Sequence, residues 1–127
     1  MNLYDMGLGP ASGPYYTGFP VKPLKELVEE HNINTINILK IDIEGSEYTA
    51  LQEFIDKQWF KDLNVQQIII EIHYFVQWGQ IRDDVIKLMN LFRDNDYHPF
   101  SKEPNLLCGP QCIEYSFIRK DFAFPNK

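Results

Sequence analysis

Apolar residues follow two different periods along this chain, and the periods predict an alternation of strands and helices. In residues 36–43 and 65–74 the apolar side chains are nearly continuous and mostly branched, which is typical of strands buried on both faces. In residues 81–92 they recur every three or four positions, as on the buried face of a helix. Residues 97–101 and 113–119 predict two further short strands, joined without a helix.

The remaining segments complete this predicted order. Residues 23–30 begin with a proline, which suits the first turn of a helix. Ser46 suits the N-cap of a second helix, which the apolar spacing extends to about Trp59. Near the N-terminus, residues 2–6 could be the tail of a strand, and residues 7–20 have the Gly and Pro content of a loop.

The order of elements predicts an α/β fold. Strands that alternate with helices pair in parallel through right-handed crossovers. Residues 36–43 and 65–74 should therefore be adjacent parallel strands. The strand at 113–119 should lie antiparallel beside the second of these, because no helix precedes it.

Composition supports one globular domain and narrows the range of partners. Of the 127 residues, 44% are hydrophobic and 14% aromatic, which is enough for a packed core. The formal net charge is -6 and no basic cluster appears, so no nucleic-acid partner is expected. No apolar run approaches the roughly 20 residues of a membrane helix, and the first residues lack the pattern of a secretory signal. These features leave the compartment open.

The first predicted buried strand runs directly into polar residues, which marks a candidate site. In open α/β sheets, ligands bind outside the carboxyl ends of the strands. Asp42 and Glu44 lie there, on the face that Lys40 shares by the two-residue period. Asp42 could accept hydrogen bonds from a ligand or act as a base, or it could be a buried carboxylate that caps the next helix. Gly45 fits a backbone turn, and Glu47 is interpreted as a first-turn helix residue only.

The second predicted buried strand carries Glu71 and ends near His73. His73 could act as a general base on an acceptor hydroxyl, because imidazole exchanges protons near neutral pH. The alternative is a structural histidine with its hydrogen bonds satisfied. Buried charges are almost always paired, so Lys40 and Glu71 are expected to form an ion pair between the two strands. His31 and His98 are expected at the surface.

The two cysteines, Cys108 and Cys112, lie in the segment CGPQC. Two free thiols in a loop are the expected state. A local disulfide is the alternative in an oxidising compartment. A zinc site is disfavoured, because nothing nearby completes a set of four Cys or His ligands.

Several segments together resemble one enzyme family. The first buried strand and the residues after it read ILKIDIEGSEYTAL, and the second reads IIIEIHY. This pair is similar to the signature of FkbM-type methyltransferases and of their animal methyltransferase-like relatives. The segments YDMGLG, PLKELVEEHNIN and CIEYSFIR also resemble those relatives. The resemblance implies a Rossmann-like class I sheet that ends in an antiparallel hairpin, with helices on both faces. It also implies methyl transfer from S-adenosylmethionine to an oxygen atom.

The resemblance also implies roles for particular residues. Asp42 and His73 would be catalytic, and Asp42, Glu44 and Gly45 would contact the cofactor. Asp42 and Glu44 could in principle hold a divalent cation through hard oxygens. Related metal-dependent O-methyltransferases, however, place an adjacent acidic and amide pair after the next strand, where this chain has EIHY. No metal is therefore expected.

One departure from the family pattern changes the expectation for this chain alone. A complete domain begins with a strand and a Gly-rich turn that holds the cofactor, and the GLG at residues 7–9 does not fit that turn. Residues 1–22 are thus expected to be a strand remnant and loop, and residues 23–127 the carboxyl-terminal part of a truncated domain. We expect weak or absent S-adenosylmethionine binding, an acceptor that the sequence does not identify, and self-association through an exposed edge strand. The alternative is a non-catalytic α/β module or partner-binding module.

Overall fold

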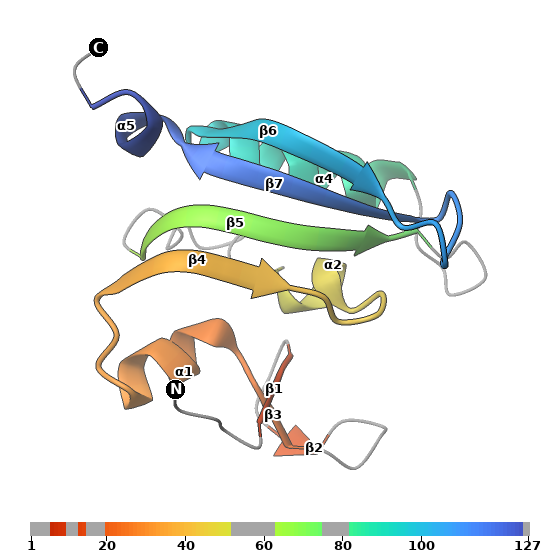
Figure 1. Cartoon of the computed structure of the whole chain (residues 1–127). Coiled ribbons are helices and arrows are strands. Elements are labelled where there is room, and N and C mark those ends of the chain that lie inside the picture. The colour runs from red at the N-terminus through yellow and green to blue at the C-terminus, as the bar shows by residue number, and fades with distance from the viewer. Residues whose placement is uncertain (1–5, 10–12, 15–19, 52–62, 75–81, 126–127) are drawn as a thin grey trace.

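The computed structural model describes residues 6–9, 13–14, 20–51, 63–74 and 82–125. Its main feature is a four-stranded sheet in the order β4-β5-β7-β6 (Figure 1). The strands are β4 (Thr35–Ile41), β5 (Asn64–His73), β6 (Tyr97–Pro104) and β7 (Cys112–Arg119). β4 and β5 are parallel, and β7 lies antiparallel between β5 and β6. The predicted α/β class, the parallel pair and the antiparallel edge pair are confirmed.

A second, smaller sheet occupies the described part of the predicted N-terminal loop. It contains β1 (Gly7–Leu8), β2 (Gly13–Pro14) and β3 (Pro20–Lys22), with β3 in the middle. The prediction of a loop across residues 7–20 is therefore wrong where the chain is described. Gly7 and Gly9 explain why strands can form here. A Cβ at Gly9 would lie 2.9 Å from the Val21 side chain, so the absence of side chains permits the close approach. The proposed strand at residues 2–6 lies almost wholly outside the described residues.

Four helices are present in the described part of the chain: α1 (Leu24–Glu30), α2 (Glu47–Ala50), α4 (Arg82–Asp94) and α5 (Lys120–Ala123). Pro23 occupies the N-cap of α1, where its fixed φ and missing N–H are tolerated. α4 matches the predicted helix to within two residues and carries Asp83 and Asp84 in its first turn, where the helix dipole favours acids. The predicted continuation of α2 towards Trp59 lies outside the described residues.

The hydrophobic core lies between the main sheet and α4, which is behind the sheet in Figure 1. Ile68, Ile70 and Ile72 alternate onto this face of β5 and are almost fully buried. Phe92 of α4 is fully buried and its ring centroid lies 4.5 Å from that of Phe117 on β7. This packing fixes β5 against α4, and Ile72 extends the buried face to the residue before His73.

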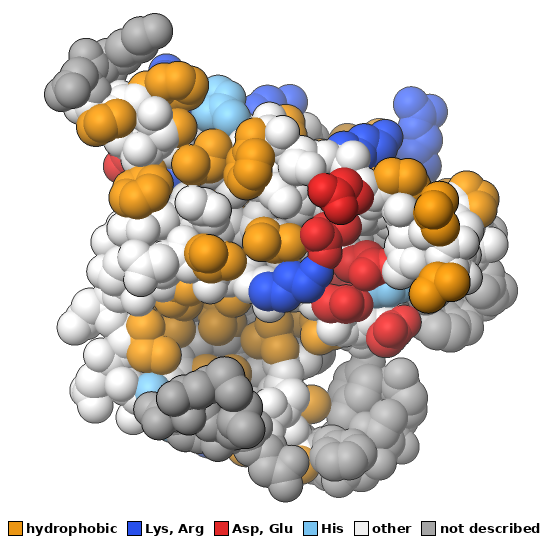
Figure 2. Space-filling model, in the orientation of Figure 1, with side chains coloured by type: hydrophobic (Ala, Val, Ile, Leu, Met, Phe, Trp, Pro, Cys, Tyr) orange, Lys and Arg blue, Asp and Glu red, His pale blue; other side chains and the backbone are white. Residues whose placement is uncertain are grey.

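The opposite face of the sheet is open. No described helix covers it, and Figure 2 shows apolar and charged side chains exposed there. The prediction that β4 is buried on both faces is wrong: Ile38 is 57% exposed, and only Ile41 in this strand is buried. The reason is that β4 is the edge strand of the sheet among the described residues, with β5 as its only neighbour in that sheet. The predicted edge strand is thus confirmed, whereas its consequence for self-association stays a prediction.

Candidate functional site

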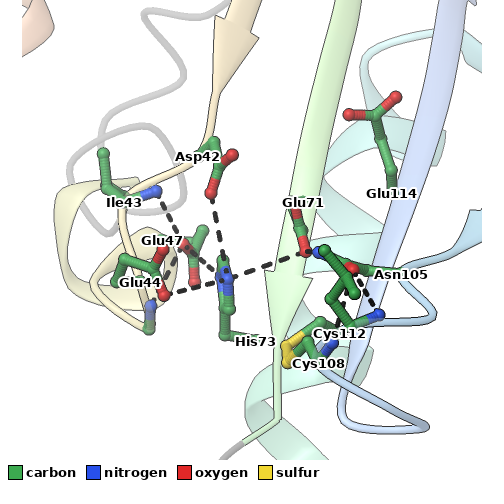
Figure 3. A network of polar contacts seen from close by, with 12 residues as sticks. Asp42, Ile43, Glu44, Glu47, Glu71, His73, Asn105, Cys108, Cys112 and Glu114 are labelled. Carbon is green, nitrogen blue, oxygen red and sulfur yellow. Dashed lines mark hydrogen bonds and ion pairs between the residues drawn. A yellow bond between two sulfur atoms is a disulfide. The ribbon is translucent and has the colours of Figure 1, made fainter.

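The carboxyl ends of β4 and β5 meet at one edge of the sheet and bring the predicted site residues together (Figure 3). The chain leaves β4 through a tight loop in which Glu44 and Gly45 have φ values of 54° and 96°. This left-handed conformation is costly for Glu44 and easy for Gly45. The loop turns the backbone back towards β5, so that α2 begins next to the carboxyl end of that strand (Figure 1).

His73 lies at the centre of this edge. Its side chain is only 3% exposed, although two of the acids around it are on the surface. Its Nε2 atom is 3.5 Å from Glu44 Oε2, 3.8 Å from Asp42 Oδ1 and 3.9 Å from Glu71 Oε1. The prediction that Asp42, Glu44 and His73 cluster at one end of the sheet is confirmed. Their catalytic and cofactor-binding roles stay predictions.

Glu47 is the main site residue that the sequence interpretation missed. It is completely buried, and its Oε1 atom lies 3.0 Å from His73 Nδ1. The same oxygen accepts hydrogen bonds from the backbone N–H groups of Ile43, at 3.1 Å, and Gly45, at 3.2 Å. The interpretation of Glu47 as a simple first-turn residue is therefore wrong. Helical spacing could have shown it, because residue 47 shares a face with the buried Leu51.

Ser46 and Tyr48 flank this glutamate. Ser46 occupies the N-cap position of α2 as predicted, but its side chain makes no capping hydrogen bond. The hydroxyl of Tyr48 donates to the backbone carbonyl of His73 at 3.1 Å. Burial, reinforced by the negative charge of Glu47, raises the pKa of Tyr48 well above its ordinary value. The tyrosine therefore remains a hydrogen-bond donor and fixes the backbone at His73.

The expected ion pair between Lys40 and Glu71 does not form. The register places Lys40 opposite Ile69, two residues before Glu71. Lys40 instead reaches across β5 to form an ion pair with Glu114 on β7. Glu71 is directly opposite Glu114 in the ladder and accepts a hydrogen bond from Asn105 Nδ2 at 2.8 Å. Lys40 is thus paired with Glu114, and Glu71 is hydrogen-bonded to Asn105.

Cys108 and Cys112 form a disulfide, so the expectation of two free thiols is wrong. Their Cα atoms are 5.7 Å apart, a usual separation for bonded cysteines. The side chain of Asn105 accepts the N–H groups of Leu107 and Cys108, and Gly109 has a φ of 82°. The resulting turn brings the two cysteines together beside His73, which pairs with Cys112 in the sheet.

The geometry leaves room for a cation at the site without requiring one. Ligand atoms of Asp42, Glu44 and His73 all lie within 4.8 Å of one another. Glu71, His73 and Cys112 are similarly close, but a cysteine in a disulfide cannot supply a thiolate ligand. The first set contains two exposed acids, which commonly gather without an ion.

An apolar pocket of about 440 Å³ lies close to the polar site but on the other side of the sheet. Its walls include Ile72 and Tyr74 of the β5 end and Val85 of α4, and the exposed Arg82 lies at its edge. Because side chains alternate along β5, Ile72 and Tyr74 share the face opposite to His73. The pocket is therefore separate from the cluster of acids. None of the helices in the described ranges is long and apolar enough to cross a membrane.

The structure is an α/β sheet with polar residues at the carboxyl ends of its two parallel strands, which is where ligands bind in open α/β sheets. A model of the methyltransferase FkbM domain matches residues 11–99, which include Asp42, Glu47 and His73. The chain therefore belongs to the FkbM methyltransferase family. No curated protein and no solved structure matched it significantly.

Proposed function

We propose that this protein takes part in S-adenosylmethionine-dependent methyl transfer to an oxygen atom, with His73 as the base. The observation that carries the proposal is the placement of His73. Its Nδ1 atom is hydrogen-bonded to the buried Glu47, and its Nε2 atom faces Asp42 and Glu44 at the edge of the sheet. Membership in the FkbM methyltransferase family supports the reaction class.

The charge of the site fits the cationic end of S-adenosylmethionine. This cofactor carries a positive sulfonium and an ammonium group, and the exposed carboxylates of Asp42 and Glu44 are suited to both. Gly45 would let the cofactor approach the backbone, because it has no side chain. When bound, S-adenosylmethionine supplies an electrophilic methyl group. This fit concerns the methionine end of the cofactor only.

The chain's own residues would handle the acceptor proton. His73 Nε2 would take the proton of an acceptor hydroxyl as the oxygen attacks the methyl group. The resulting imidazolium would lie between Glu47 on one side and the two exposed acids on the other, which stabilises its positive charge. A hydroxyl acceptor is favoured over an amine because a hydroxyl loses its proton during attack and needs such a base.

A substitution experiment tests the role of His73 in a form of the protein that transfers methyl groups. His73→Ala should lower kcat by about 10²–10⁴-fold, the usual contribution of a general base, and Asp42→Asn should weaken cofactor use. The matched control is His98→Ala, because His98 is exposed on β6. Methyl transfer is measured as S-adenosylhomocysteine produced, and circular dichroism checks folding. An unchanged kcat in a folded His73→Ala protein would show that His73 is a structural residue and not the base.

A binding experiment tests the cofactor site in the 127-residue chain itself. S-adenosylmethionine at millimolar concentration should shift the amide NMR signals of residues 42–47 and 71–74, with a Kd of about 1 mM or weaker. S-adenosylhomocysteine is the control, because it lacks the sulfonium charge and should bind more weakly. A micromolar Kd would show that the chain alone forms a full cofactor site. The expectation that residues 23–127 are the carboxyl-terminal part of a longer domain stays a prediction.

The edge position of β4 favours a second candidate function, which is binding of another chain. Its outer backbone groups and the exposed Ile38 offer a template for a further strand. Light scattering of the chain should reveal self-association. Ile38→Lys should reduce it, because a charge on an edge strand opposes pairing. A monodisperse monomer at high concentration would remove this candidate.

A further inference from the structure

We infer that Glu47 is the positioning residue of His73: its buried carboxylate fixes the imidazole as the tautomer with a proton on Nδ1. This inference rests on the proposed role of His73 as a base, and it adds a residue to which the sequence motif gave no function. In this arrangement Nε2 is the nitrogen that exchanges protons with a substrate.

The hydrogen bonds of Glu47 determine the direction of its contact with His73. Oε1 accepts the N–H groups of Ile43 and Gly45, and a backbone N–H can only donate. Two N–H donors on Oε1 favour its unprotonated form, because a carboxylate oxygen accepts hydrogen bonds more strongly than the oxygen of an O–H group. In the 3.0 Å contact with His73 Nδ1, we therefore assign the proton to the ring nitrogen. The other oxygen of Glu47 has no hydrogen-bond partner in the described part of the chain.

The same arrangement selects Nε2 as the atom facing the substrate side. The exposed carboxylates of Asp42 and Glu44 lie on the Nε2 side of the ring (Figure 3). The imidazole is nearly fully buried and its Nδ1 atom is held by Glu47, so the ring presents Nε2 on this side. A neutral histidine with a proton on Nε2 could not accept one there. A fixed Nδ1–H tautomer is thus what a base at this position needs.

The loop after β4 explains how a helix glutamate becomes buried here. The left-handed residues Glu44 and Gly45 curl the backbone so that two loop N–H groups point at one carboxylate. These bonds compensate for the loss of hydration at Glu47. A glutamate whose role was only to balance the dipole of α2 would act equally well from the surface. Its complete burial against His73 is the feature that such a role leaves unexplained.

Nitrogen NMR of the histidine ring in the 127-residue chain tests the inference directly. At a pH where the ring is neutral, two-bond ¹H–¹⁵N correlations should show His73 as the Nδ1–H tautomer, with a strongly downfield Nδ1 proton. Glu47→Gln keeps the size and an oxygen acceptor but removes the charge, so this proton should move upfield. Glu44→Gln is the matched control on the Nε2 side and should leave the Nδ1 proton in place.

The possible outcomes separate this inference from the proposed function. An Nε2–H tautomer in the native chain, or an Nδ1 proton that ignores Glu47→Gln, would overturn the positioning role. In a methyl-transferring form, Glu47→Gln should lower kcat by about 10-fold or more while KM for S-adenosylmethionine stays unchanged. If the tautomer is correct but His73→Ala is fully active, the proposed function fails and the structural assignment of the tautomer stands.

Discussion

β4 and β5 are similar in sequence but differ sharply in environment. Both contain runs of branched apolar residues and end in polar ones. In β5, Val65, Ile68 and Ile70 are completely buried, whereas Ile38 in the middle of β4 is 57% exposed. The difference arises from position, because β5 lies between β4 and β7 and β4 is at the edge. An apolar run shows that a strand is suited to burial, and its neighbours determine whether burial occurs.

The two strand charges show the same contrast. Glu71 on β5 is 8% exposed and is held by Asn105. Lys40 on β4 has a side chain that is 48% exposed, and its partner Glu114 is also in contact with solvent. A buried carboxylate depends on its hydrogen bonds, whereas an exposed ion pair is weakened by water and salt. The comparison therefore predicts that substitutions on β5 lower the free energy of unfolding strongly, whereas substitutions on β4 change it little.

The largest difference is expected for isoleucine truncation in the two strands. Ile70→Ala removes fully buried atoms from the core and should lower the free energy of unfolding by about 2–5 kcal/mol. Ile38→Ala removes largely exposed atoms and should change it by less than about 0.5 kcal/mol. Urea unfolding at low protein concentration measures both. Equal losses would mean that the open face is covered by a partner in solution.

The next effect concerns the support of Glu71. Asn105→Ala removes the donor to this buried carboxylate and the acceptor for two loop N–H groups. The expected loss is about 1–3 kcal/mol, because a buried polar group is left unsatisfied. Asn37→Ala on β4 is the control: Asn37 donates to Gln66 at the surface, and its loss should be below about 0.5 kcal/mol. If Asn105→Ala leaves the free energy of unfolding unchanged, water must replace the hydrogen bond that Asn105 donates to Glu71.

A third experiment tests whether the site depends on a cation. We expect methyl transfer at the carboxyl ends of β4 and β5 to need no metal ion. His73, positioned by Glu47, would remove the acceptor proton without one. Methyl transfer should therefore continue in excess EDTA, with less than about a twofold change, well below the contribution of a general base. Complete loss on chelation and recovery with one divalent ion would instead assign Asp42, Glu44 and His73 as its ligands.

The sequence was sufficient for some of these features and not for others. Side-chain periods and the strand–helix order predicted the pairing of β4 with β5, and the strand ends located Asp42 and His73. The Lys40 partner was not predictable, because it depends on a two-residue difference in register that the apolar pattern does not specify. The bond between Cys108 and Cys112 depends on a turn built by Asn105 and Gly109, and a pair of cysteines is compatible with either state.

Tyr97 provides a pH-dependent test of how β5 is anchored. Its hydroxyl donates to the carbonyl of Val65 at the start of β5, and burial raises the pKa of Tyr97 to about 12. Because the folded pKa lies above the ordinary value of 10.0, the native state retains this proton longer than the unfolded state. The contribution of Tyr97 to stability should therefore be constant below pH 10 and should be lost as the pH rises from 10 towards 12.

Tyr97→Phe should therefore cost about 1 kcal/mol at neutral pH through the lost hydrogen bond and reduce the alkaline slope. Urea unfolding between pH 8 and about 11.5 measures both effects, within the range set by the shifted pKa. Tyr48 also has a raised pKa, so part of the slope should remain in this variant. An unchanged slope in Tyr97→Phe would show that the titration of Tyr97 does not control alkaline stability.

The smallest effect is expected for the ion pair on the open face. Lys40 and Glu114 are both accessible to water, so a double-mutant cycle with Lys40→Met and Glu114→Gln should give a coupling of at most about 1 kcal/mol. Added salt should reduce it, because the Debye length is only about 8 Å at physiological ionic strength. Glu114→Gln alone removes the ion pair with Lys40 but also a like charge opposite Glu71, and the second change should offset the first. A coupling above about 2 kcal/mol that resists salt would falsify the conclusion that this face is exposed to solvent, because only burial protects an ion pair from screening. The contrast between β4 and β5 would then disappear.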